Sequence, residues 1–209
     1  MTAPADNPEN LLETLLSTIE TQIVPLTTKG VSSGSKLFGA AILRKDDLSA
    51  VTIHCIQQFF SSPDTTSSPR PATRDCIFVT THEPCSLCLS GITWSGFDNF
   101  YHLFTYEDSR DRFGIPYDIE ILQEVFRVRA VEGVHESDES LARRPLYNRR
   151  NKFFTAKSFA DLVGEMTGGE KVKRKWRGEI ERVKGLYDGL SGTYQEGKSQ
   201  GVASASVWK

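Results

Sequence analysis

Cysteine, histidine and long apolar runs are all scarce in this chain of 209 residues. The four cysteines, at positions 55, 76, 85 and 88, are too few and too clustered for the disulfide framework of a small secreted domain. No apolar run reaches the length of about 18 residues that a membrane-spanning helix needs, and residues 1–6 do not resemble a signal peptide. We therefore expect an intracellular protein, cytoplasmic or nuclear, with no membrane partner.

A net charge of −2 conceals an uneven distribution of charge along the chain. Residues 1–140 contain 10 lysines and arginines against 20 acidic residues, whereas residues 141–209 contain 15 against 7. Such a split can mean that two parts of one fold attract each other, or that the basic part forms a surface for a polyanion. The sequence alone leaves both interpretations open.

Hydrophobic periodicity predicts alternating helices and strands. The predicted helices span residues 10–24, 51–60 and 117–127. The predicted strands span residues 37–43, 75–80 and 99–104. We expect Pro25 to end the first helix and Asp47 or Ser49 to cap the second. Alternation of this kind predicts an α/β fold, in which helices cover the faces of a sheet.

Composition divides the chain into three expected parts. Residues 1–140 would form the α/β domain, residues 141–192 a basic helical extension, and residues 193–209 a disordered tail rich in glycine and serine.

Two cysteines lie where a predicted strand meets a predicted helix. The apolar run at 76–79 is followed by Thr80-Thr81-His82-Glu83-Pro84-Cys85-Ser86-Leu87-Cys88, and helical spacing then continues to about residue 94. On the first turn of a helix, sulfurs three residues apart face the same side, and the free N–H groups of the helix start favour thiolates. This pair therefore has the form of half a zinc site.

Other roles are known for a Cys-x-x-Cys pair. A thioredoxin-like redox pair is disfavoured because nothing around Cys85 and Cys88 resembles the rest of that domain. A closed structural zinc site is disfavoured because it needs four protein ligands, and the chain has no second Cys-x-x-Cys or histidine pair. What remains is a site with two thiolates, at most one further protein ligand and an open position.

The stretch 81–88, preceded by Phe38-Gly39-Ala40-Ala41, resembles the zinc-dependent cytidine deaminase superfamily, whose signature is H-x-E followed by P-C-x-x-C. Over residues 10–130 the chain looks most like the branch with the CMP/dCMP-type deaminase domain. The resemblance implies a three-layer α/β/α fold with a mixed sheet and a Zn²⁺ cofactor. It also implies hydrolytic removal of an amino group from a nucleobase, nucleoside or nucleotide.

The same resemblance implies roles for particular residues. Cys85 and Cys88 match two zinc ligands, and Thr81 and Glu83 are expected beside the substrate pocket. In the family a His or Cys on the preceding helix is the third ligand, and a Glu two residues later shuttles protons between the zinc-bound water and the ring.

The first half of the signature is missing here. Neither His54 nor Cys55 is followed two places later by a glutamate, so no catalytic residue can be named. Residues 44–49 are also too few for the additional strand that the family has at this place, so the sheet is expected to lack an edge strand. A single internal deletion, natural or in the gene model, would explain both absences, and the chain is then expected to have little activity.

His54 is the candidate for the third zinc ligand. It lies one helical turn from the expected position, a displacement of about 5–6 Å, and would reach the metal only if its helix slides. The alternative is a buried, hydrogen-bonded histidine, and Cys55 and Cys76 are expected to be small core residues.

A second function class is a non-catalytic deaminase-like subunit or an RNA-binding partner. The basic region from Arg143 to Lys184 interleaves Tyr147, Phe153 and Trp176 with its cations, a pattern that can contact phosphates and stack on bases. The alternative is a solvated helix packed on the acidic domain. The resemblance also implies a homo- or hetero-oligomer.

Overall fold

The structure is a computed structural model, and it describes residues 4–33, 35, 37–53, 56–61, 69–128 and 137–200. Within these residues five strands form one sheet in the order β2-β1-β3-β4-β5. The strands are β1 Ala40–Arg44, β2 Ala50–Thr52, β3 Cys76–His82, β4 Asn99–Phe104 and β5 Thr155–Ser158. β1 pairs antiparallel with β2 and β3, whereas β3, β4 and β5 run parallel. The predicted α/β fold with a mixed sheet is confirmed.

The helices of the described residues follow the strands in alternation through the middle of the chain. The α-helices are α1 Pro8–Thr18, α2 Val24–Ser32, α3 Ile56–Ser61, α4 Ser86–Trp94, α5 Tyr106–Phe113, α6 Tyr117–Ile121, α7 Asp138–Ala142, α8 Phe159–Glu165, α9 Glu170–Gly185 and α10 Asp188–Ser199. The described residues also contain short helical turns of two other kinds. The π-helical turns are η2 Ile19–Ile23 and η4 Leu122–Phe126, and the 3-10 turns are η1 Pro4–Asp6 and η3 Thr73–Asp75.

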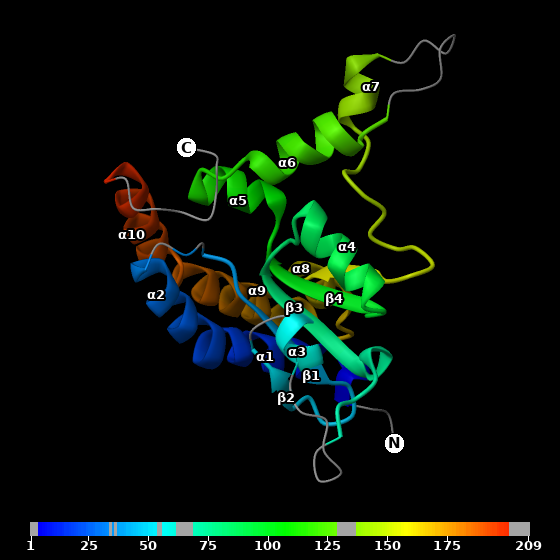
Figure 1. Cartoon of the computed structure of the whole chain (residues 1–209). Coiled ribbons are helices and arrows are strands. Elements are labelled where there is room, and N and C mark those ends of the chain that lie inside the picture. The colour runs from blue at the N-terminus through cyan, green and yellow to red at the C-terminus, as the bar shows by residue number, and fades with distance from the viewer. Residues whose placement is uncertain are drawn as a thin grey trace.

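Helices cover both faces of the sheet, so the fold has three layers (Figure 1). Alternate residues of β3 divide between the layers: Ile77 and Val79 pack with α1, α8 and α9, whereas Phe78 packs with α3 and α4. Side chains that alternate along a strand point to opposite faces, so a strand buried on both faces is apolar throughout. This explains why β3 was predictable as a continuous apolar run.

The first helix does not end at Pro25. α1, η2 and α2 follow one another from Pro8 to Ser32, and Pro25 lies in the first turn of α2. A proline is tolerated there because its missing N–H is not needed at the start of a helical segment, and the π-helical turn before it changes the hydrogen-bonding pattern.

The predicted helix over 51–60 is wrong in its first half, and so is the expectation of a missing edge strand. Residues 50–52 form β2, the edge strand, which returns from β1 through a tight turn. Leu48 has a positive φ of 60° in this turn, and Asp47 accepts a hydrogen bond from the Ser49 N–H at 2.8 Å. Asp47 therefore shapes a hairpin rather than capping a helix. His54 and Cys55 lie outside the described residues.

The basic C-terminal part is built into the same core. β5 extends the sheet beside β4, and α9 packs on α1 and α8 with Trp176, Ile180 and Val183 buried. The division at residue 140 stays a prediction about domains, but the sheet continues across it. α10 runs to Ser199, whereas we expected no regular structure from residue 193; residues 201–209 lie outside the described residues. No helix in the described part is long and apolar enough to cross a membrane.

Candidate metal centre

Cys85 and Cys88 lie on the first turn of α4, immediately after β3. Cys85 is the N-cap residue of the helix, and its Sγ accepts a hydrogen bond from the Cys88 backbone N–H at 3.5 Å. Cys85 is half-buried and Cys88 is exposed. The structure therefore places both cysteines at the carboxyl end of a parallel strand, the edge at which open α/β sheets bind ligands.

The surroundings of Cys85 favour a thiolate. Hydrogen bonds from the Cys88 side chain and from backbone N–H groups outweigh partial burial and lower the pKa of Cys85 to about 6. A thiolate is the form of cysteine that binds a metal, and zinc accepts sulfur ligands readily. The two sulfurs therefore fit a zinc ion as neighbouring ligands.

Within the described residues, no group of three His, Cys, Asp or Glu side chains is placed to hold a metal ion. His54, the predicted third ligand, is not among those residues. Of the three predicted zinc ligands, the structure thus brings Cys85 and Cys88 together.

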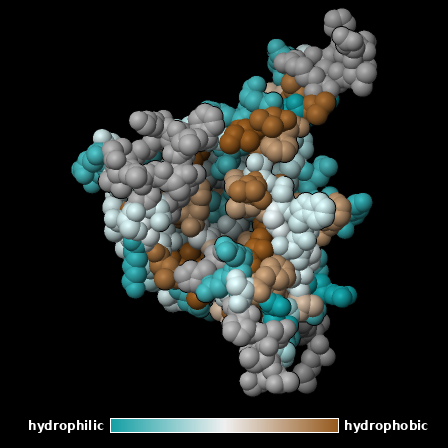
Figure 2. Space-filling model, viewed as in Figure 1, coloured by the Kyte–Doolittle hydropathy of each residue, from teal (hydrophilic) through white to brown (hydrophobic). Residues whose placement is uncertain are grey.

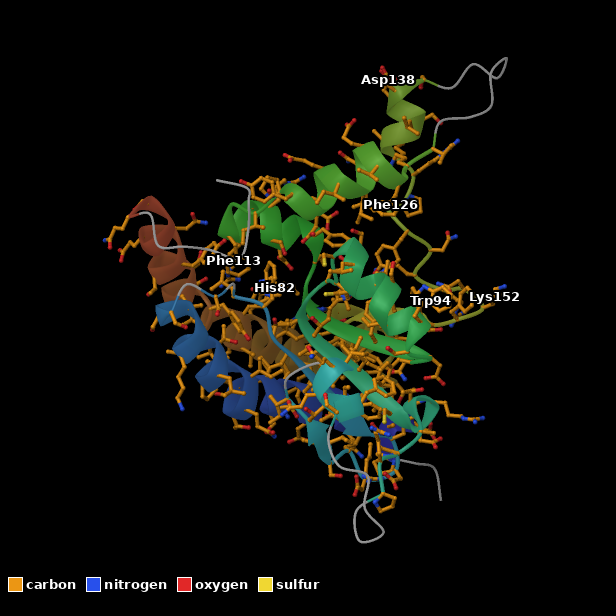
Figure 3. The ribbon with its side chains drawn as sticks, viewed as in Figure 1. His82, Trp94, Phe113, Phe126, Asp138 and Lys152 are labelled. Carbon is orange, nitrogen blue, oxygen red and sulfur yellow. The ribbon has the colours of Figure 1, made fainter. Side chains whose placement is uncertain are left out.

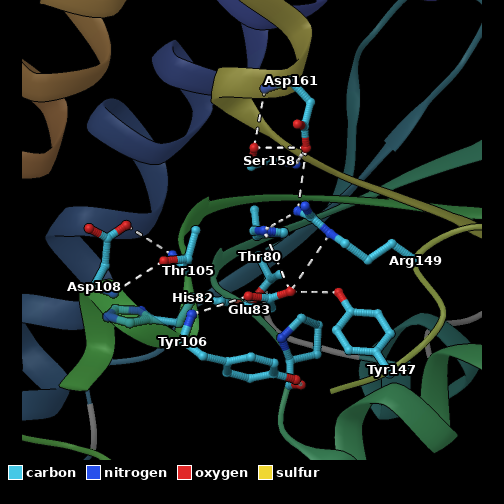
Figure 4. Close-up of polar contacts among 12 residues, drawn as sticks. Thr80, His82, Glu83, Thr105, Tyr106, Asp108, Tyr147, Arg149, Ser158 and Asp161 are labelled. Atoms are coloured by element: carbon cyan, nitrogen blue, oxygen red, sulfur yellow. Dashed lines mark hydrogen bonds and ion pairs between the residues drawn. The ribbon is translucent and has the colours of Figure 1, made fainter. Parts of the chain in front are cut away.

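Glu83, two residues before Cys85, is a buried carboxylate held from both sides (Figure 4). The Tyr147 hydroxyl donates to Oε1 at 2.7 Å, and the Tyr106 backbone N–H donates to Oε2 at 3.1 Å. Burial raises the pKa of Glu83, and these hydrogen bonds act in the opposite direction. Glu83 therefore points into the protein, toward donors that come from two other elements.

Arg149 connects Glu83 to the first turn of α8. Its Nη2 lies 3.3 Å from an Asp161 oxygen and 3.0 Å from His102 Nε2, and its Nε lies 4.0 Å from Glu83 Oε1. A guanidinium can only donate, so His102 Nε2 accepts and the proton of this imidazole is on Nδ1. Burial lowers the pKa of His102 to about 3, which keeps the ring neutral.

Thr81 and His82 are also buried at the end of β3. The Thr81 hydroxyl accepts a hydrogen bond from the Gly39 N–H at 2.9 Å, which joins this strand end to the residue before β1. His82 lies among aromatic rings, with ring centroids 4.6 Å from Phe38 and 4.8 Å from Phe104. Thr81 and Glu83, the residues expected to contact substrate, thus both have side chains engaged inside the protein.

Sequence reasoning missed Tyr106, Tyr147 and Arg149. Tyr106 is the second residue after β4, so the rule that parallel strands end at one edge of the sheet could have placed it near Cys85. Tyr147 and Arg149 carried no such signal, since the basic segment around them was interpreted either as an RNA-binding surface or as a helix packed on the acidic domain.

The surface next to α4 is apolar. Leu87 is 80% exposed and Trp94 91% exposed on α4, and Val125 and Phe126 of η4 and Val128 just after it are exposed as well. Figure 2 shows hydrophobic residues gathered over α6, and in Figure 3 Phe126 and Trp94 lie at the periphery while His82 and Phe113 lie inside. Contiguous apolar surface often marks a contact with another molecule, but the expected oligomer stays a prediction.

No protein-family model matches this chain, and no curated protein matches it significantly. Among solved structures it is similar to guanine deaminase from Nitrosomonas europaea, with 14% identity, a TM-score of 0.34, and coverage of 88% of this chain and 85% of that one. It is also similar to NE0047 in complex with 2,6-diaminopurine, with 14% identity, a TM-score of 0.34, and coverage of 95% and 83%. A mutant of NE0047 in complex with 8-azaguanine gives 15% identity, a TM-score of 0.35, and coverage of 76% and 82%. At these values the likenesses identify no family.

Proposed function

We propose that this chain is a member of the zinc-dependent deaminase superfamily, of the CMP/dCMP-type branch, and that its reaction is hydrolytic deamination of a nucleobase, nucleoside or nucleotide. The observation that supports this most is the position of Cys85 and Cys88. They follow a buried parallel strand, occupy the first turn of the next helix, and have a Pro immediately before them, as in the P-C-x-x-C half of the signature.

Cys85 and Cys88 would hold the zinc ion. Zinc in such a site supplies Lewis acidity, which makes water a nucleophile near neutral pH. The chain's own contribution is to keep the two sulfurs together on a rigid turn at the sheet edge. In the reaction one water is consumed, the amino group leaves as ammonia, and a carbonyl oxygen takes its place. Thr81 and Glu83 are buried and hydrogen-bonded, which favours a supporting role for them over direct contact with substrate.

Metal analysis combined with an ammonia-release assay tests this proposal. The purified protein is loaded with zinc, desalted and assayed with a panel of cytosine, adenine and guanine compounds as bases, nucleosides and nucleotides. We expect about one zinc per chain and ammonia release from one class of base. A protein that retains no zinc after loading contradicts the proposal.

A non-catalytic role is the second candidate. It is favoured by the sequence, in which no His-x-Glu or Cys-x-Glu occurs anywhere, so the proton-shuttling glutamate of the family has no counterpart. Bound zinc without ammonia release from any compound of the panel would favour this candidate over catalysis.

RNA binding by the basic segment is less well supported. Arg182 lies 2.7 Å from Glu20, and Lys184 lies 2.9 Å from Asp108, so these cations of α9 face acids of the first 140 residues. This arrangement supports the interpretation that the two charged parts attract each other.

RNA binding can be tested by substitution. Deleting residues 141–209 would remove β5, so a substitution of the exposed Lys171 and Arg174 by Glu is the better test. Salt-dependent RNA retention that survives this change would exclude this face of α9 as the RNA surface.

A further inference from the structure

Tyr147 lies 64 residues from Glu83 in sequence, yet its hydroxyl reaches the Glu83 carboxylate. Tyr147 belongs to the segment between α7 and β5, which passes along the carboxyl edge of the sheet close to α4 (Figure 4). The Tyr147 ring is fixed by packing as well, since its centroid lies 6.2 Å from that of Tyr106. A side chain from the basic C-terminal part thus contacts the turn that bears the cysteines.

The turn before Cys85 is held at two successive residues. Glu83 donates its backbone N–H to the Phe104 carbonyl at 2.9 Å and receives the Tyr147 and Tyr106 hydrogen bonds on its carboxylate. The Tyr106 hydroxyl donates to the Pro84 carbonyl at 2.5 Å. Two tyrosines therefore fix the two residues that lead directly into the first sulfur ligand.

Glu83 is only 8% exposed, so its carboxylate depends on these donors. A buried carboxylate that loses a donor is left with an unsatisfied oxygen, and it lowers its energy by rotating toward water. Where rotation about the side-chain bonds alone does not bring the carboxylate to water, the Glu83 backbone shifts with it, and Pro84 and Cys85 follow. Metal affinity depends on groups that hydrogen-bond to the ligands or to their neighbours. When such groups hold a ligand in its binding conformation, less conformational freedom is lost when the metal binds.

The segment that carries Tyr147 is itself anchored. The Arg149 carbonyl accepts a hydrogen bond from the Ala156 N–H on β5 at 2.7 Å, and the Arg149 side chain contacts Asp161. Asp161 in turn belongs to the capping box that starts α8, with Ser158 as the N-cap residue. The Tyr147 hydroxyl is therefore presented to Glu83 by a fixed part of the sheet edge.

We propose that Tyr147 is a positioning residue for the metal centre: through its hydrogen bond to Glu83 it holds the Pro84–Cys85 turn in the conformation that binds the ion. This inference rests on the proposed function, since it takes Cys85 as a metal ligand. It makes the C-terminal part of the chain a component of the site.

The test compares Tyr147→Phe with the wild-type full chain. Affinity for Zn²⁺ is measured at 10 °C by competition with a chromophoric chelator, and Co²⁺ absorption reports sulfur ligation directly. We expect Tyr147→Phe to weaken zinc binding about 10-fold, the lower end of the effects known for groups that orient metal ligands. Tyr101→Phe is the matched control, because the Tyr101 hydroxyl forms no hydrogen bond within the described part of the chain, and its affinity is expected to equal that of wild type.

A double-mutant cycle separates positioning from general loosening of the structure. If Tyr147 acts through Glu83, then Tyr147→Phe adds little further loss of zinc affinity in a Glu83→Ala background. Melting of the metal-free proteins shows whether each variant is folded at 10 °C. Should Tyr147→Phe not be folded, Glu83→Ala, which removes the acceptor of the Tyr147 hydroxyl, tests the same contact, with at least the same expected loss of affinity.

The outcomes are distinct. Zinc affinity of Tyr147→Phe within twofold of wild type, or losses that add fully in the double variant, overturns the positioning role while leaving the proposed function intact. A wild-type protein that binds neither Zn²⁺ nor Co²⁺ overturns the proposed function, and the positioning role with it.

Discussion

Gly39 lies directly against Ile23: a Cβ atom at residue 39 would come within 2.3 Å of the Ile23 Cγ2 atom. Ile23 is 1% exposed and belongs to the last turn of η2, so it has little freedom to move away. The π-helical turn η2 therefore packs directly against the residue that precedes β1.

Gly39→Ala is therefore expected to destabilise the protein by about 1–3 kcal/mol, the usual effect of overpacking a filled core. Urea denaturation measures the change. Gly178→Ala is the control, since nothing lies within 4 Å of an added Cβ on that residue of α9. Alanine is the better helix former by about 0.8–1.0 kcal/mol, so this variant should be more stable than wild type. Equal stabilities of Gly39→Ala and wild type would contradict the close packing of η2 on residue 39.

Trp176 tests whether the C-terminal part folds as one unit with the rest. The side chain is 5% exposed, and its indole N–H donates to Glu9 Oε1 at 2.9 Å, so it joins α9 to α1. We expect Trp176→Ala to cost about 3–5 kcal/mol and Trp176→Phe considerably less, because phenylalanine keeps most of the buried ring. Lys171→Ala, at an exposed position of the same helix, should change stability little.

Equilibrium unfolding followed by fluorescence and by circular dichroism distinguishes the alternatives. A single transition that shifts in Trp176→Ala supports one cooperative unit. Two transitions, of which only one responds to the substitution, would instead support a separate domain after residue 140.

Sequence patterns predicted the elements that local composition specifies. β3 was predictable because residues 76–79 form a continuous apolar run. α4 was predictable because Pro84 and Cys85 mark the start of a segment with helical spacing. β2 was missed because a three-residue edge strand carries no periodicity, and its existence depends on the turn at Asp47 and Leu48. α10 was missed because its glycines and serines favour disorder, whereas burial of Tyr194 against the main core favours the helix.

The residues of the candidate site also differ in whether the sequence alone predicts that they lie together. The Cys85–Cys88 pair was predictable because its two residues lie on one helical turn and are therefore close in sequence. Tyr147 and Arg149 were not, since their contacts with Glu83 are made across the fold by a segment that has no regular structure of its own. The C-terminal part appeared to be an appendage for the same reason: pairing with β4 is invisible in the sequence of β5.

His82 predicts a dependence of stability on pH. Burial lowers its pKa to about 3 in the folded protein, and the nearby Asp108 carboxylate acts in the opposite direction. In the unfolded chain a histidine has a pKa of about 6.5, so below that pH the unfolded state binds a proton that the folded state does not. Each such histidine then lowers the free energy of unfolding by about 1.4 kcal/mol per pH unit as the pH falls toward 3.

His82→Phe removes this contribution while keeping a ring among Phe38 and Phe104. Between pH 6 and pH 4 its free energy of unfolding should therefore decrease less steeply than that of wild type, by about 1.4 kcal/mol per unit. Phe113→Leu, a core substitution that adds and removes no titratable group, should lower stability equally at each pH. Parallel curves for wild type and His82→Phe would show that His82 is not the buried neutral group described above.

Cys85→Ser tests the metal centre through stability. A ligand that binds only the folded protein stabilises it by about 2.7 kcal/mol when its concentration is 100 times its dissociation constant. We expect Cys85→Ser to lose both the bound zinc and this stabilisation. The free energies of unfolding of wild type and variant should therefore differ in excess zinc and become similar when a chelator is present. Cys76→Ala provides the control: this buried thiol lies on β3, outside the pair, so its variant should keep the zinc and the zinc-dependent rise in melting temperature. A Cys85→Ser protein that keeps the full rise would exclude Cys85 as a ligand, whatever else binds the ion.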